Sequence, residues 1–176
     1  MRTLIALVMT VMLQVPAWAA GWSFSVRDTP VGPLCVAATS QNGVSLGFYG
    51  VPLGPTYAFV KGVNLPRNAR STWQVAGYEW RQFVGAADSY NGVHIYPGIR
   101  PNLLAEVAAG SRLDLYLHDA GLAGNAPLTG TLGLSLRGSS HSIAALRECQ
   151  AGHHRAAPGV LVVVDVDAYI LPALPY

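Results

Sequence analysis

Charged side chains are scarce in this sequence. Asp, Glu, Lys and Arg together make up 11% of its 176 residues, against about 25% in an average globular protein. The formal net charge is only +2, which is too balanced for a nucleic-acid-binding surface. Few charges combined with 19 glycines are typical of a turn-rich β protein. The composition therefore predicts a β-rich chain with no nucleic-acid partner.

The sequence also lacks an apolar run long enough to cross a bilayer as a helix, which takes about 20 residues. The apolar run Leu4 to Leu13 follows Arg2 and is closed by Ala17-Trp18-Ala19. A charged start, a short apolar middle and a small-x-small ending are typical of a cleaved secretory signal, and an uncleaved anchor is the alternative. We predict a signal peptide over residues 1–19, one domain over 20–176, no membrane span after cleavage, and a periplasmic or secreted location.

Cysteine is limited to Cys35 and Cys149, with no C-x-x-C pair, which argues against catalysis of thiol–disulfide exchange. Two cysteines in an exported chain pair with each other more often than they stay as buried thiols. The bond would close a loop of 115 residues, counted from Cys35 through Cys149. We therefore predict one structural disulfide, Cys35–Cys149.

No metal-binding spacing is present either. A zinc site needs several imidazole or thiolate ligands aimed at one point, and the histidines show no such pattern. Asp165 and Asp167 could share one strand face, but no calcium-binding loop surrounds them. We predict no metal and no cofactor; the histidines considered are His94, His118, His141, His153 and His154.

Alternation of apolar and polar residues predicts the first strands. Trp22–Val26 has the period of a strand with one buried face. Leu34–Thr39 and Val44–Tyr49 flank Asn42-Gly43, and an Asn-Gly pair between two apolar runs is a strong hairpin signal. Tyr57–Val63 is the next candidate.

The later strands are less regular. Trp73–Val84 is interrupted only by Gly77 and is predicted to be one long strand or a bulged pair. We expect a turn over Asp88–Gly92, followed by a short strand that Pro97-Gly98 stops. Further strands are predicted over Arg112–His118, with Leu113, Leu115 and Leu117 inward, over Thr131–Leu136, and over Gly159–Leu171.

Two short helices are expected between these strands. Pro101 opens the first, over Asn102–Ala109, and Gly110 stands at its C-terminal cap. Ser139 or Ser140 caps the second, which ends near Cys149. The predicted fold is mainly β: an antiparallel β-sandwich or barrel with one or two short helices and one disulfide.

One motif has a catalytic counterpart. Gly43-Val44-Ser45-Leu46-Gly47 matches the G-x-S-x-G pattern of serine hydrolases, and Asp114 or Asp119 followed by His141 fits their chain order. The hydrolase serine, however, sits between a strand and a helix, whereas Ser45 lies inside an alternating strand pattern after a hairpin turn. A small exported hydrolase using Ser45 is therefore an alternative rather than the first hypothesis.

Three aromatic residues suggest a second alternative. Trp73, Tyr78 and Trp80 could stack on sugar rings if their side chains lay on an open surface. Aromatic residues in strands more often pack in the core. We treat the three as a candidate binding surface of a carbohydrate-binding module.

The order of several residues resembles a known family. Trp22 and Cys35 come early, Gly110–Leu113 follows in mid-chain, and Ser135–Gly138 leads into a short helix ending in Cys149. This pattern resembles the invasion-associated locus B family of small exported proteobacterial proteins, over roughly two thirds of the chain after the signal. The resemblance implies a periplasmic β-sandwich or barrel linked to the envelope or to host interaction, with no catalytic residue.

Two regions depart from that family pattern, residues 50–90 and residues 159–176. The resemblance therefore supports the location more than an activity. Our first hypothesis is an exported, non-enzymatic β domain that binds a protein or a cell-envelope component through loops and exposed strand surface.

Overall fold

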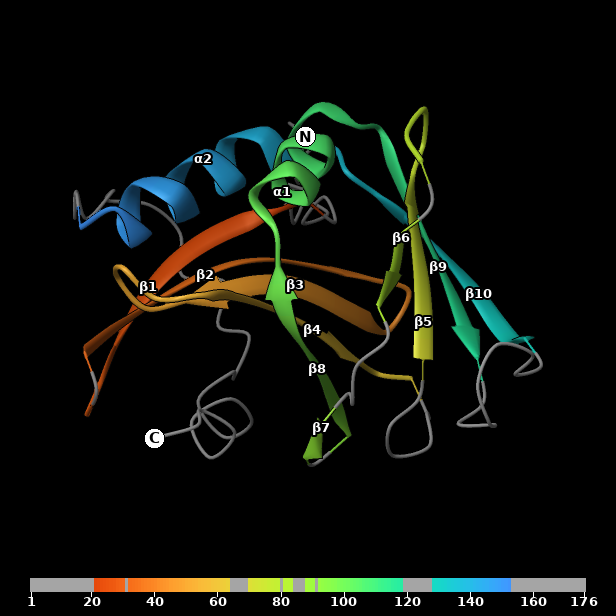
Figure 1. The fold of residues 1–176 in the computed structure, drawn as a ribbon, viewed down its shortest axis with the longest axis horizontal. Coiled ribbons are helices and arrows are strands. Elements are labelled where there is room, and N and C mark those ends of the chain that lie inside the picture. The colour runs from red at the N-terminus through yellow and green to blue at the C-terminus, as the bar shows by residue number, and fades with distance from the viewer. Residues whose placement is uncertain are drawn as a thin grey trace, which may run out of the picture.

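In the computed structural model, the residues described are 21–30, 32–63, 70–79, 81–83, 88–90, 92–118 and 128–152. Within these ranges the chain forms two antiparallel sheets and two helices. Both sheets have edge strands, so the fold is a sandwich and not a closed barrel. Figure 1 shows both helices over one face of the larger sheet, beside the smaller sheet. The predicted mainly β fold with short helices is confirmed.

The larger sheet has six strands in the order β1-β2-β3-β4-β8-β7. Strands β1 to β4 follow one another in the sequence, and each pairs with the next as an antiparallel hairpin. Strand β4 then pairs with β8 on its other side. The strands are β1 (Ser23–Thr29), β2 (Gly32–Gln41), β3 (Val44–Gly50), β4 (Thr56–Lys61), β7 (Asp88–Tyr90) and β8 (Val93–Ile99).

The smaller sheet has four strands in the order β10-β9-β5-β6. Strand β9 coincides with the prediction from the alternating leucines, and Leu113, Leu115 and Leu117 are buried as expected. The strands are β5 (Arg70–Val75), β6 (Arg81–Phe83), β9 (Arg112–His118) and β10 (Leu128–Ser135).

The predicted Asn-Gly hairpin is confirmed. Asn42 and Gly43 have φ values of 52° and 79°, and Gln41 pairs with Val44 across them. A two-residue turn with positive φ at both positions matches the twist of antiparallel strands. The turn therefore sets the register of β2 against β3.

Of the two alternatives predicted for Trp73–Val84, one long strand or a bulged pair, the single long strand is wrong, because the region forms a pair of strands, β5 and β6. The chain reverses after Val75, where Gly77 has φ 87° and the amide of Tyr78 donates to the carbonyl of Val75 at 2.9 Å. Strands β5 and β6 then pair with each other. Gly77 adopts the left-handed backbone that a tight turn needs.

The predicted turn over Asp88–Gly92 is too long, and the next strand is longer than predicted. Asp88–Tyr90 is strand β7, and the chain reverses at Gly92, so that Tyr90 pairs with Val93. Strand β8 continues past Pro97 because a one-residue irregularity opposite β4 leaves Pro97 outside the regular ladder. Proline is tolerated in a strand where no amide donor is needed.

Helix α1 (Pro101–Ala109) begins and ends where the sequence predicted. Gly110 is its C-terminal cap, but with φ −80°, so backbone conformation does not require glycine there. A Cβ at this position would collide with the side chain of Val75. Gly110 thus permits close contact between α1 and strand β5.

Helix α2 (Ser139–Gln150) is capped differently from the prediction. Its N-cap is Gly138, with φ 86°, and no side chain caps it. The hydroxyl of Ser139 instead donates to the carbonyl of Val107 at 2.7 Å and is buried. Ser139 therefore joins α2 to α1, a role that local sequence does not reveal.

A row of aromatic rings fills the space between the sheets. Trp22 stacks on Phe48 at 5.9 Å between ring centroids, Phe48 meets Trp73 at 6.2 Å, and Trp73 meets Tyr96 at 5.5 Å. Apolar residues from both sheets and both helices surround them. This inner core holds the sandwich together.

A second apolar cluster lies on the opposite face of the six-stranded sheet. We call it the outer cluster. Its members all come from β2, β3, β4 and β8: Leu34, Val36, Ala38, Tyr49, Phe59, Val93 and Ile95. Alternating neighbours on the same strands, such as Cys35 and Phe48, belong to the inner core. The six-stranded sheet is therefore apolar on both faces.

The predicted disulfide is confirmed. Cys35 on β2 is bonded to Cys149 near the end of α2, with 6.0 Å between their Cα atoms. The bond fastens α2 to the inner face of the six-stranded sheet.

The predicted signal peptide, residues 1–19, and the predicted strand over 159–171 lie outside the described residues. Neither described helix has the length and hydropathy needed to span a membrane.

We expect loss of the disulfide to be costly. The Cys35–Cys149 sequence separation is 114, and the chain-entropy model gives about 5 kcal/mol for a loop of this size. The double variant Cys35→Ala/Cys149→Ala should lower the free energy of unfolding by about this amount in urea titrations. Dithiothreitol should have a similar effect on the wild type and none on the variant; equal stability of wild type and variant would contradict the assignment.

Candidate functional site

The hydrolase motif folds as ordinary strand. Ser45 lies within β3, where it pairs with Ser40 on one side and Lys61 on the other. Its hydroxyl lies 2.8 Å from that of Ser40. A nucleophile elbow requires a sharp turn leading from a strand into a helix, and β3 is antiparallel to both neighbours. The pattern Gly43 to Gly47 is therefore not an elbow.

The other proposed hydrolase residues do not join Ser45. Asp114 is on the four-stranded sheet and pairs with Arg112. His141 is an exposed residue of α2, and Asp119 lies outside the described residues. Neither Asp114 nor His141 is therefore shown in contact with Ser45 as its general base.

The three proposed sugar-binding aromatic residues are not equivalent. Trp73 is fully buried, and its indole N–H donates to the Ser71 hydroxyl at 2.6 Å. Trp73 is thus a core residue, which corrects the prediction that it contributes to an open surface. Tyr78 is 40% exposed, and Trp80 lies outside the described residues.

Histidines are dispersed over the fold. His94 is buried between the sheets, where burial lowers its pKa below the usual 6.5, although a hydrogen bond with the Val63 backbone opposes this. His118 Nε2 lies 3.3 Å from the Thr72 hydroxyl. Among the described residues, no three His, Cys, Asp or Glu side chains gather as metal ligands.

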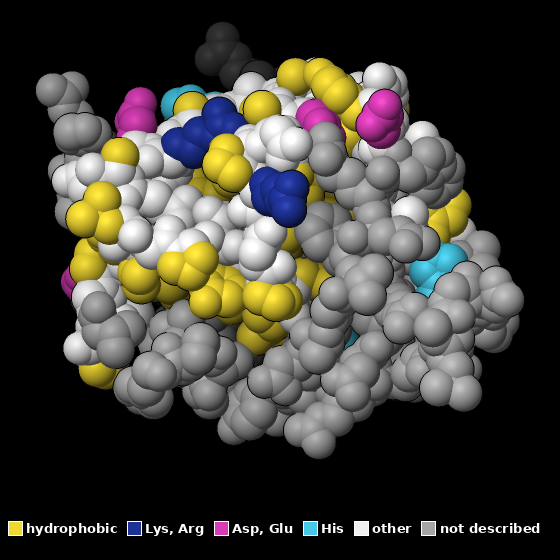
Figure 2. Space-filling model, viewed as in Figure 1, with side chains coloured by type: hydrophobic (Ala, Val, Ile, Leu, Met, Phe, Trp, Pro, Cys, Tyr) yellow, Lys and Arg dark blue, Asp and Glu magenta, His cyan; other side chains and the backbone are white. Residues whose placement is uncertain are grey.

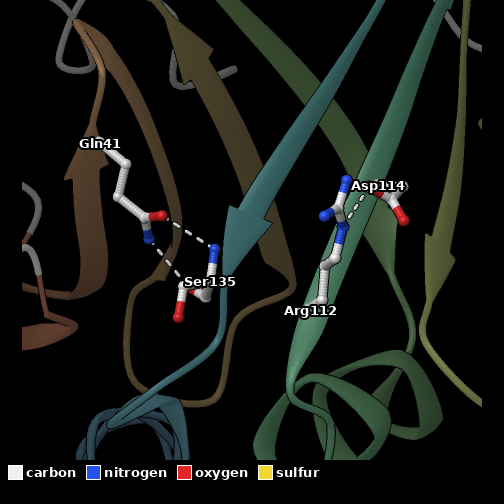
Figure 3. A network of polar contacts seen from close by, with 4 residues as sticks. All are labelled: Gln41, Arg112, Asp114 and Ser135. Atoms are coloured by element: carbon white, nitrogen blue, oxygen red, sulfur yellow. Dashed lines mark hydrogen bonds and ion pairs between the residues drawn. The ribbon is translucent and has the colours of Figure 1, made fainter.

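The exposed face of β9 and β10 carries an ion pair. Arg112 Nε lies 2.7 Å from Asp114 Oδ1, and the two side chains are 61% and 19% exposed (Figure 3). Gly133 on β10 pairs with Asp114, and a Cβ there would meet the Arg112 guanidinium. The arginine therefore extends across the neighbouring strand, and its charge is balanced locally.

Charge is sparse elsewhere on the surface as well. Figure 2 shows a few Lys, Arg, Asp and Glu side chains scattered among uncharged and apolar atoms on the described part of the face in view. The described part of this face shows no large cluster of charge of one sign. This favours recognition through hydrogen bonds and apolar contacts over long-range electrostatic attraction.

Gln41 joins the two sheets at the end of β10. Its Nε2 donates to the carbonyl of Ser135 at 2.8 Å, and its Oε1 accepts from the amide of Ser135 at 2.8 Å (Figure 3). The Trp22 indole also donates to the Ser135 carbonyl, at 3.2 Å. The Gln41 amide thus pairs with Ser135 as a residue of an adjacent strand would.

The direction of these bonds shows how β10 is oriented. Both backbone groups of Ser135 point away from β9, toward Gln41, whereas the amide of Leu136 donates to Ser111 beside β9 at 3.0 Å. Backbone groups alternate in direction along an antiparallel strand. The amides and carbonyls of Thr131 and Gly133 therefore point away from β9 as well.

Strand β10 is at the edge of its sheet, so these groups face no further strand among the residues that the structure describes. Thr131 and Gly133 are both exposed, and the described part of the chain supplies no hydrogen-bond partner on this side. We call residues 131–133 the open edge of β10. They carry no lysine or proline, the residues that commonly protect an edge strand from pairing.

Sequence reasoning missed both Gln41 and the open edge. The pattern of β10 identified a strand, but position within a sheet depends on which strands meet after folding. Gln41 follows the predicted β2 and carries no motif. Its partner, Ser135, lies 94 positions away in the sequence.

Comparison with known proteins yields a likeness of fold. No family model matches the chain, and no curated protein matches its sequence. The structure is similar to the crystal structure of invasion associated protein B from Bartonella henselae, with a TM-score of 0.52, 17% sequence identity, and coverage of 73% of this chain and 93% of that one. The family resemblance seen in the sequence is thus supported at the level of the fold.

Replacing Gln41 should expose the end of β10. In Gln41→Ala the Ser135 amide loses its acceptor, so its hydrogen exchange should accelerate at least tenfold while that of Leu134, which bonds to β9, stays slow. Loss of two exposed hydrogen bonds should cost about 1–2 kcal/mol of folding free energy. Gln41→Asn, which keeps the amide but is one methylene shorter, should behave like alanine; unchanged Ser135 exchange in both variants would refute the pairing.

The buried His94 should make stability depend on pH. Its folded pKa lies below 6.5, so the unfolded chain binds more protons just below this pH, and the free energy of unfolding falls as pH falls from 6.5 toward the folded pKa. Urea titrations at pH 7.5 and 5.0 should show a smaller loss for His94→Gln than for the wild type. Equal losses would mean that His94 does not contribute.

Proposed function

We propose that this protein is an exported, non-enzymatic binding domain that takes up an extended segment of an envelope or secreted protein as an additional strand beside β10. The observation that carries this proposal is the open edge of β10. There, the backbone groups of Thr131 and Gly133 are exposed and directed outward beside a charge-balanced surface.

Strand addition suits this edge physically. Main-chain hydrogen bonds supply affinity, and side chains at alternate positions supply specificity. A residue placed opposite Leu132 would point inward and contact that half-buried side chain. Residues opposite Thr131 and Gly133 would point outward, next to the Arg112–Asp114 pair. The preferred segment therefore has an apolar residue between two small or polar ones.

The structure also limits the length of such a segment. Gln41 already occupies the outward groups of Ser135, and the ladder is irregular between Leu128 and Gly130 at the other end. A bound strand must end or turn away at Gln41. The β10 strand of a second copy would continue into Gln41, which disfavours a dimer formed through this edge.

Several observations support an extracytoplasmic site of action. The N-terminal 19 residues have the features of a secretory signal, and the Cys35–Cys149 bond is compatible with an oxidising compartment. The fold is similar to that of a protein named for invasion. A partner exposed in the envelope or outside the cell fits all three.

A displayed library of random ten-residue peptides, selected on the purified mature protein, tests the proposal. Selected peptides should alternate apolar and polar residues. In Gly133→Pro, which removes one outward amide, their affinity should fall at least tenfold. The matched control is Gly133→Ala, which places the same Cβ near Arg112 but keeps the amide, and it should bind within about twofold of wild type.

Hydrogen exchange gives the second readout. The Thr131 and Gly133 amides should exchange rapidly in the free protein and slow at least tenfold when peptide binds. Selected peptides that bind Gly133→Pro as tightly as wild type, and leave both amides fast, would place binding elsewhere and overturn the proposal.

A further inference from the structure

Leu53, in the connection between β3 and β4, is the most exposed large apolar residue of the described chain. It is 91% exposed, whereas the other exposed large apolar residues of that part, Val26 and Tyr78, reach 41% and 40%. No charged residue lies between positions 50 and 56. Single apolar residues are common on protein surfaces, so exposure alone does not assign a role to Leu53.

The backbone of Leu53 gives a second and independent observation. The Gly54 amide donates to the Val51 carbonyl at 3.0 Å, which closes a β-turn with Pro52 and Leu53 at its centre. Proline followed by a residue with positive φ is the pattern of a type II turn, in which glycine usually takes the second central position. Leu53 has φ 59°, where the Cβ of an L residue crowds the following carbonyl. Both its backbone and its exposure therefore disfavour leucine here.

A contact with helix α2 accounts for the conformation of this turn. The Leu53 amide donates to the carbonyl of Gln150 at 2.8 Å, at the end of α2, where carbonyls lack a partner within the helix. Glycine or asparagine would supply the same amide with less strain. The hydrogen bond thus explains the left-handed backbone and leaves the leucine side chain unexplained. Strained backbone that persists in a fold concentrates at functional positions.

The base of the turn packs closely on the end of α2. The Thr56 hydroxyl donates to Oε1 of Gln150 at 3.1 Å. A Cβ at Gly50 would collide with the Gln150 side chain and with the carbonyl of Pro55. Glycine at position 50 therefore permits this contact, and the turn is fixed against the helix on both of its sides.

Covalent constraints hold the same region. The disulfide at Cys149 fixes α2 to strand β2 one residue before Gln150, and the rings of Pro52 and Pro55 fix the backbone φ on either side of Leu53. Leu53 is therefore presented in one position. Little conformational freedom remains to be lost when a partner binds it, which favours affinity.

We propose that Leu53 anchors a second interaction surface, where a folded protein partner receives its side chain in an uncharged apolar pocket. A turn that projects one apolar side chain fits a pocket better than an extended groove. This inference does not rest on the strand addition proposed for β10. Figure 1 shows α2, on which the turn packs, ending on the side of the molecule opposite β10.

Charge and size favour a protein over a lipid surface as the occupant. One leucine side chain is much smaller than a myristoyl chain, which by itself gives only marginal membrane binding. Attraction to anionic lipid requires clustered basic residues, and positions 50–56 contain none. The adjacent C-terminus of α2 carries the negative end of the helix dipole. Full burial of a leucine in a protein pocket, in contrast, raises affinity at least tenfold.

Substitutions at position 53 should separate folding from binding. Leu53→Asn keeps the amide that bonds to Gln150 and tolerates positive φ, so its urea midpoint should equal or exceed that of the wild type. Leu53→Met keeps an apolar side chain and is the matched control, with a midpoint close to that of the wild type. A clearly lower midpoint for Leu53→Asn alone would show that the leucine serves the fold and would contradict the proposal.

Photocrosslinking followed by affinity measurement tests the partner. Benzoylphenylalanine at position 53 of the mature protein, mixed with envelope and secreted fractions of the source organism, should crosslink to one protein that the same probe at Tyr78 does not capture. That protein, once purified, should bind wild type and Leu53→Met within about threefold of each other and Leu53→Asn at least tenfold more weakly. No captured protein, or equal affinity for both variants, would overturn the proposal.

Two further measurements distinguish the other occupants. Vesicles of phosphatidylethanolamine and phosphatidylglycerol should not bind the mature protein, and sedimentation should give the same mass for wild type and Leu53→Asn. Vesicle binding or self-association that Leu53→Asn abolishes would assign the side chain to lipid or to a second copy, against the proposal. Peptides selected for the open edge of β10 should bind Leu53→Asn as tightly as wild type, so that failure of one proposal is distinguishable from failure of the other.

Discussion

The arrangement of this protein follows from one constraint: its six-stranded sheet is apolar on both faces. One face buries Phe48 and its neighbours against the four-stranded sheet and the two helices. The Cys35–Cys149 bond then fastens α2 to that face. The other face carries the outer cluster. The strand addition that we propose uses neither broad face, because β10 lies at the edge of the smaller sheet.

Gln41, on the six-stranded sheet, connects that sheet to the strand edge used in the proposed function. It extends from the β2–β3 hairpin, whose register is set by the Asn42-Gly43 turn, and takes the outward groups of Ser135. The same contact that ties the two sheets together also ends the stretch of β10 that is free to pair. The fold thus leaves a short edge where a longer one would invite aggregation.

The strand and helix positions were predictable where a local rule governs them. Alternating leucines identified β9, the Asn-Gly pair identified the hairpin, and Pro101 marked the start of α1. The predictions were wrong where contact with another strand or helix changes the local structure. Strand β8 continues past Pro97 because an irregularity opposite β4 accommodates the missing amide. Ser139 forms a bond to α1 in place of a cap, because Val107 lies beside it only after folding.

The sequence by itself determined the fold class, the pairing of the only two cysteines and the inward face of β9, because these depend on residue period and on a count that allows one pairing. Only the tertiary structure decided that Trp73 belongs to the core, that Ser45 lies in a plain strand, and that β10 is an edge. Those outcomes depend on which elements meet across long sequence separations. The spacing of residues along the chain does not indicate which strand will lie at the edge of a sheet.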